Sequence, residues 1–156
     1  ICGGHLEAVL DTLLYIRRET SAWLELTTLV IPGENDSDEE IDALSRWVAA
    51  NLGNDVPLHF TAFRPEWKML DTPPTPGHTL TRCREIALKN GLDYVYTGNV
   101  HDRQGGSTWC HHCGSRLIER DWYQIGEWNL DGQGRCKRCS TPERTQTRFS
   151  PRARRC

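Results

Sequence analysis

The clearest alternation of apolar and polar segments lies between residues 24 and 64. Residues 24–31 form an apolar, β-branched run that ends at Pro32-Gly33, which predicts a strand buried on both faces, as in a parallel sheet. After Ser37, apolar residues recur three to four positions apart up to Gly53, which predicts an amphipathic helix. A second strand is expected over residues 58–63. The segment is therefore predicted to form a βαβ unit with parallel strands.

Local signals place the loops of this unit. Ser37 and Glu40 have the spacing of a capping box, in which the Ser hydroxyl accepts from a backbone N–H of the first helical turn and the Glu carboxylate accepts from the backbone N–H of the Ser. Chemistry in parallel α/β folds gathers at the carboxyl ends of strands. Residues 34–36 and 63–65 are therefore the expected positions of functional side chains.

Further elements flank the βαβ unit. Residues 5–20 are predicted to form an amphipathic helix, and because no strand precedes it, we expect an incomplete α/β fold. A second helix is predicted over about residues 79–90 and a short strand over 94–96, after a proline-rich loop at 66–77. Residues 103–107 are expected to be a flexible boundary. The predicted apolar stripe of the first helix comprises Leu6, Val9, Leu10, Leu13 and Ile16.

Charge divides the chain unevenly. Residues 1–134 are acidic, with a balance of −9, whereas residues 135–156 carry +7. Residues 141–156 contain five arginines without apolar periodicity, so we expect a disordered basic tail. The expected domains are an α/β body over residues 1–103, a metal-binding ribbon over 104–140 and the tail over 141–156.

Four of the seven cysteines form two CxxC pairs, Cys110–Cys113 and Cys136–Cys139, 22 residues apart. Four thiolates at this spacing predict a structural zinc site, and residues 116–129 between the pairs are expected to form short strands. Zinc binding contributes about 10–16 kcal/mol to folding, against about 2–4 kcal/mol for a disulfide. Free or disulfide-bonded cysteines and a rubredoxin-like iron site are the alternatives.

The remaining histidines and cysteines carry weaker signals. His111 and His112 lie between the ligands and are expected to be exposed rather than metal-bound. Cys83 falls on the apolar face of a predicted helix and is interpreted as a core residue. Paired cysteines without a recognisable signal peptide or membrane span indicate a reducing, cytoplasmic compartment and no membrane partner.

A set of segments resembles one enzyme family. ICGGHLEAVLDTL, LTTLVIPGENDSDEEI, VPLHFTAFRPEWKMLD, YVYTGNVHD and the CxxC…CxxC pattern are similar to the AmmeMemoRadiSam-system radical S-adenosylmethionine enzymes, relatives of the pyruvate formate-lyase activating enzymes. The resemblance covers about residues 1–140. It implies the C-terminal portion of a partial TIM-like (β/α) barrel, followed by the small zinc-ribbon-like module.

The resemblance also implies chemistry. In this family a 4Fe-4S cluster held by CxxxCxxC reduces S-adenosylmethionine to a 5′-deoxyadenosyl radical, which abstracts hydrogen from a substrate or partner protein. This chain has no CxxxCxxC, so we expect it to be inert without the N-terminal half of the barrel.

The resemblance suggests where a cofactor would be contacted. Asn35 and His59 are the candidate cofactor-binding residues, with turn chemistry and a buried structural histidine as the respective alternatives. Asn99 and His101 follow the last predicted strand and are weaker candidates.

A different function class fits part of the same pattern. A zinc ribbon with a basic arm is typical of modules that contact nucleic acid or a protein partner. The ribbon itself carries Glu119, Asp121, Glu127 and Asp131, which makes nucleic acid an unfavourable partner for its surface.

Overall fold

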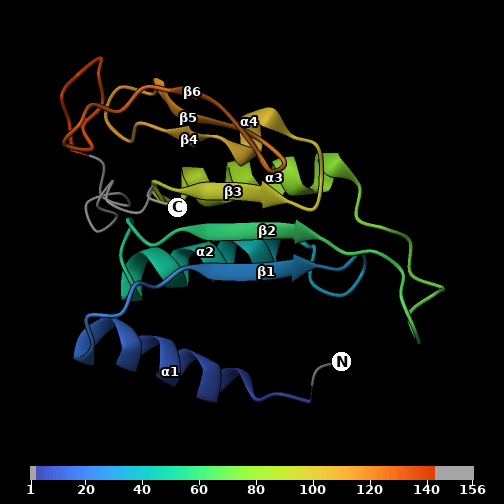
Figure 1. The fold of residues 1–156 in the computed structure, drawn as a ribbon. Helices are drawn as coiled ribbons and strands as arrows, with labels where there is room; N and C mark the ends of the chain where they lie inside the picture. The colour runs from blue at the N-terminus through green and yellow to red at the C-terminus, as the bar shows by residue number, and fades with distance from the viewer. Residues whose placement is uncertain (1–2, 143–156) are drawn as a thin grey trace, which may run out of the picture.

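A computed structural model describes residues 3–142, so the predicted tail lies outside the described residues from position 143 onwards. The α/β body contains a parallel sheet and three helices (Figure 1). The elements of this body are α1 (Leu6–Glu19), β1 (Leu26–Val30), α2 (Asp38–Asn51), β2 (Leu58–Ala62), α3 (Gly77–Lys89) and β3 (Val95–Gly98).

The strands of the body follow one another across the sheet. Their order is β1-β2-β3 and both pairings are parallel, with Leu26 opposite Leu58 and Leu58 opposite Val95. Figure 1 shows α2 and α3 side by side behind the sheet, and residues of both helices belong to one apolar core. The predicted parallel βαβ unit is thus confirmed and extended by a second one.

The core lies on the helical face of the sheet. Phe60 and Leu58 are fully buried there and pack with residues of α2 and α3. The prediction that residues 24–31 are buried on both faces is wrong, because Leu29 on the opposite face is 44% exposed and Thr27 is exposed. The helices cover one face only, so alternate residues of β1 remain accessible.

The first helix packs weakly. No residue of α1 is fully buried, although Leu13 and Leu14 pack partly against the core. Leu6, at the start of the predicted apolar stripe, is 71% exposed. An ion pair between Arg17 and Asp55, at 2.9 Å, links α1 to the segment before β2.

The loops of the body are held by specific hydrogen bonds. Ser37 Oγ accepts from Glu40 N at 3.3 Å, which confirms the predicted N-cap. The Glu40 carboxylate accepts from the Ser37 hydroxyl at 3.1 Å, in place of the predicted bond from the Ser37 backbone N–H. The proline-rich loop is anchored by buried Thr75, whose hydroxyl donates to Val30 O and accepts from Phe63 N. That loop is therefore tied to the carboxyl ends of β1 and β2.

A second, antiparallel sheet forms the ribbon. The short helix α4 (Arg103–Gly106) precedes this sheet. The sheet consists of β4 (Thr108–Trp109), β5 (Arg116–Asp121) and β6 (Gln124–Trp128), with strand order β4-β5-β6. The short strands predicted over residues 116–129 are confirmed. The expected flexible boundary at 103–107 is instead the helix α4, capped by the Asp102 carboxylate, which accepts from Gly105 N at 2.9 Å.

The close packing of α4 against β3 generates a stability prediction. A Cβ at Gly105 would lie well inside van der Waals contact with Thr97 Oγ1 and Asp102 Oδ2, whereas at Gly106 the nearest atom, Arg120 O, would be 3.5 Å away. We expect Gly105→Ala to lower the free energy of unfolding by about 1–3 kcal/mol through overpacking. Gly106→Ala is the matched control and should leave urea unfolding nearly unchanged. Equal effects of the two substitutions would contradict this account of the boundary.

Candidate functional site

The four paired cysteines converge on one point. Their sulfur atoms all lie within 4.8 Å of one another, with 3.6 Å between Cys110 Sγ and Cys139 Sγ and 3.7 Å between Cys113 Sγ and Cys136 Sγ. Four sulfurs at the usual zinc–sulfur length of about 2.3 Å, placed tetrahedrally, are about 3.8 Å apart. A disulfide would require about 2.05 Å. The four cysteines can therefore hold one metal ion, and the arrangement is compatible with zinc.

Two equivalent turns bring the sulfurs together. Gly114 N donates to Cys110 O at 2.9 Å, and Ser140 N donates to Cys136 O at 2.8 Å. Gly114 and Ser140 both have left-handed backbones, with φ of 67° and 61°. Each CxxC pair is thus followed by a left-handed residue that turns both thiols inward, and at Ser140 the sequence held no glycine to signal it.

The pKa values of the Cys110 and Cys113 thiols differ. A hydrogen bond from the Ser115 hydroxyl, 3.0 Å from Cys113 Sγ, lowers the pKa of Cys113 to about 6. Burial raises the pKa of Cys110 to about 12. A metal ion must displace the Cys110 proton, whereas Cys113 offers a thiolate at neutral pH, so metal binding will release protons.

The neighbouring histidines do not join the four sulfurs. His111 Nδ1 lies 3.0 Å from the Tyr94 hydroxyl, and the His112 side chain is exposed. The cluster identified among the described residues consists of the four cysteines alone. Residues 117, 118 and 130 form a small apolar core beside it, together with buried Cys110 and Cys136.

Asn35 is occupied by its own loop. Its Oδ1 accepts from Ile31 N at 2.7 Å and its Nδ2 donates to Leu29 O at 3.0 Å. Both ends of the amide therefore fold the segment after β1 back onto the strand end. This turn role accounts for Asn35, and cofactor binding by this residue stays a prediction.

His59 lies on the face of the sheet opposite the helices. Its Nε2 is 2.9 Å from Glu25 Oε2, and its ring stacks on Tyr96 with centroids 5.0 Å apart. The Trp23 indole N–H donates to the other oxygen of Glu25 at 2.7 Å. The histidine is only half-buried, so the alternative of a buried structural histidine does not describe it; its role in cofactor binding stays a prediction.

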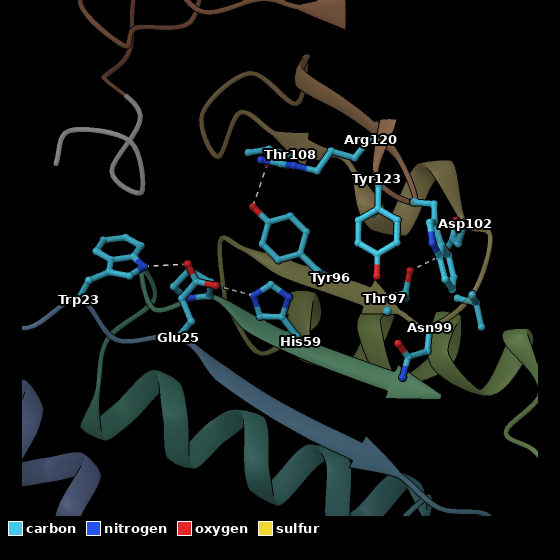
Figure 2. A pocket seen from close by; sticks show the side chains of 15 residues that line it. Trp23, Glu25, His59, Tyr96, Thr97, Asn99, Asp102, Thr108, Arg120 and Tyr123 are labelled. Atoms are coloured by element: carbon cyan, nitrogen blue, oxygen red, sulfur yellow. Dashed lines mark hydrogen bonds and ion pairs between the residues drawn. The ribbon is translucent and has the colours of Figure 1, made fainter. Parts of the chain in front are cut away.

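A cavity of about 500 Å³ lies between this face of the sheet and the ribbon. Figure 2 shows Trp23, Glu25, His59 and Tyr96 along one side and Tyr123 directed from the ribbon toward the sheet. Asn99 also lines the cavity; its backbone is left-handed, with φ of 59°, and its Nδ2 donates to Ala62 O at 3.3 Å.

The predicted and observed groups overlap only in part. His59 and Asn99 share the cavity, but Asn35 belongs to a separate loop and His101 stacks on Trp122, with ring centroids 5.1 Å apart. Sequence reasoning missed Glu25 and Arg120, both of which line the cavity. The Glu25 signal was visible as a charge inside an apolar strand pattern, whereas nothing in the sequence associates Arg120 with the sheet.

Comparison with known proteins gives one relative without an assigned activity. The chain is 40% identical over 140 residues to the uncharacterized protein MJ0808 of Methanocaldococcus jannaschii. The match covers 89% of this chain and 42% of the relative, so the chain spans about two fifths of that protein's length. No family model matches the chain.

The helices of the described part are too short or too polar to cross a membrane.

Metal content tests the four-cysteine site. We expect about one zinc ion per chain, without iron or acid-labile sulfide, and we expect Cys110→Ser to lose it because a closed tetrahedral site needs all four thiolates. Cys83→Ala is the matched control, since Cys83 is buried in the other core and should leave the zinc in place. Elemental analysis of anaerobically purified protein makes the measurement. Iron with sulfide, or full zinc in Cys110→Ser, would refute the assignment.

Proposed function

We propose that the chain is the C-terminal portion of a radical S-adenosylmethionine enzyme barrel, which becomes catalytic when the cluster-bearing portion completes it. The observation that carries the proposal is a parallel sheet that packs against α2 and α3 on one face only. The family resemblance of residues 1–140 supplies the reaction type: reductive cleavage of S-adenosylmethionine to a 5′-deoxyadenosyl radical.

The direction of the crossovers supports a barrel. Strand order β1-β2-β3 means that both crossovers run the same way, and right-handed connections then place α2 and α3 on the same face. In a doubly wound fold the strand order reverses at a switch point and helices cover both faces. Successive strands with all helices outside are the repeating unit of a (β/α) barrel.

The uncovered face supports a missing partner. Parallel sheets are normally buried on both faces. Within the described residues, the face opposite the helices presents two rows of side chains that no helix covers, and the ribbon lies beside β3. Closing the barrel with further strands would turn this face into the interior wall. The rows are Thr27, His59 and Tyr96, and Leu29, Thr61 and Gly98.

The metal chemistry divides between the two portions. A 4Fe-4S cluster places each thiolate on a different iron, whereas Cys110, Cys113, Cys136 and Cys139 surround a single point, as a structural zinc ion requires. In this proposal the zinc folds the ribbon and the CxxxCxxC cluster comes from the other portion. S-adenosylmethionine then reacts only in the assembled barrel, with His59 on its wall.

Reconstitution tests the proposal. We expect this chain, mixed anaerobically with the separately produced CxxxCxxC-bearing portion of a family member, to form 5′-deoxyadenosine from S-adenosylmethionine and dithionite. This chain alone should form none. Leu29→Asp should abolish assembly, because it places a charge on the face that the other portion covers, while changing the free energy of unfolding of this chain by only about 0.5 kcal/mol. The measurements are chromatographic detection of 5′-deoxyadenosine and urea unfolding.

The control places the same substitution on the other side of the molecule. Leu88 is an exposed leucine of α3, so Leu88→Asp should leave assembly intact. If Leu29→Asp assembles as well as Leu88→Asp, the face is not a docking surface. If the chain alone takes up iron and sulfide and cleaves the cofactor, the proposed division of labour is wrong.

A further inference from the structure

We propose that the cavity between the sheet and the ribbon binds a small molecule that carries an aromatic ring and a carboxylate. The cavity measures about 500 Å³, which is within the range of small-molecule sites. The cavity shares His59 and Tyr96 with the face that the proposed barrel would enclose, but binding is measured on this chain alone, so its failure is distinguishable from a failure of the function proposed above.

Aromatic side chains form two walls of the cavity. Tyr96 stacks on His59, and its hydroxyl lies 3.0 Å from Thr108 Oγ1 of β4, which holds the ring between the sheet and the ribbon. Tyr123 reaches toward the sheet from the β5–β6 hairpin (Figure 2) and is 88% exposed, so its ring face has room for a partner. A flat, exposed ring such as that of Tyr123 favours a planar ligand.

The hairpin that presents Tyr123 has an unusual backbone. Trp122 has φ of 55°, a left-handed conformation that is rare for a bulky residue, and its ring stacks on His101 with an interplanar angle of 24°. Trp122 is the first of the two residues that join β5 to β6, a position where two-residue hairpin turns require a positive φ. Here the turn directs Trp122 and Tyr123 to the cavity rim, and Asn99, at φ of 59°, lies in the same wall.

The charges around the cavity favour an anion at Arg120. Within residues 3–142, one contact of the Arg120 guanidinium is found, with the hydroxyl of Thr108, and it has no carboxylate partner. A guanidinium has five N–H donors, so most of the Arg120 donors remain available to a ligand. Figure 2 shows it on the ribbon side of the cavity, near the hydroxyl end of Tyr96.

Two carboxylates line the cavity among residues 3–142, and both are already engaged. Glu25 accepts from Trp23 and contacts His59, and Asp102 accepts from the Thr97 hydroxyl at 2.9 Å and from Gly105 N. Neither carboxylate contacts Arg120, so the group left to recognise a ligand charge is the cation. A carboxylate meets a guanidinium through two parallel hydrogen bonds, which defines the ligand class as an aromatic acid.

Matched probes test this site on the zinc-loaded chain. We expect 4-hydroxyphenylacetate to bind at least about tenfold more tightly than its neutral amide, the ratio that one hydrogen-bonded charge contributes. Isothermal titration of the unmodified protein measures both affinities. Equal affinities, or no saturable binding of the acid, would overturn the proposal.

Two pairs of variants locate the site. Arg120→Gln should remove the preference for the acid over the amide, whereas Arg116→Gln, on the same strand but outside the cavity, should retain it. Tyr123→Ala should weaken both probes alike, whereas Tyr15→Ala, which removes an exposed ring from α1, should weaken neither. Zinc content and circular dichroism identify variants that fail to fold. A folded Arg120→Gln that keeps the preference would overturn the assignment, because the anion would then bind elsewhere.

Discussion

The burial of one face of a parallel sheet, while its other face stays open, is the constraint on which the rest of the structure depends. Phe60, Leu58 and Val30 are buried against α2 and α3, and this contact provides the main apolar core. Two crossovers in the same direction leave no helix for the opposite face. That face therefore carries accessible side chains such as Leu29 and His59, and it forms one side of the cavity.

The ribbon depends on a different physical interaction. Its apolar core contains three aliphatic residues beside the cysteines, and β6 is exposed along its whole length. So small a core gives little stability by itself, and metal binding by four thiolates is the natural source of the remainder. The same module carries Arg120 and Tyr123. A metal ion held by the four cysteines would act on the cavity indirectly, because it would fix the strands that form the outer wall.

The two sheets are joined by short polar contacts. Asp102 caps α4 and receives the Thr97 hydroxyl of β3, and Tyr96 of β3 contacts Thr108 of β4. The absence of a side chain at Gly105 permits α4 to lie this close to β3. A segment whose glycines suggested flexibility is therefore a short helix packed closely against β3, since glycine also serves where elements approach closely.

Local patterns in the sequence were enough to predict several features of the fold and the cysteine site. The βαβ order, the cap at Ser37, the stop at Gly53 and the four cysteines follow from periodicity, turn chemistry and ligand spacing, which act over a few residues. One-sided burial of β1 could not be deduced, because an apolar run does not reveal whether a second layer covers it. The cavity was also decided by tertiary structure alone: Glu25 precedes β1, His59 belongs to β2 and Arg120 to β5, and only packing of the ribbon beside the sheet places them around one space.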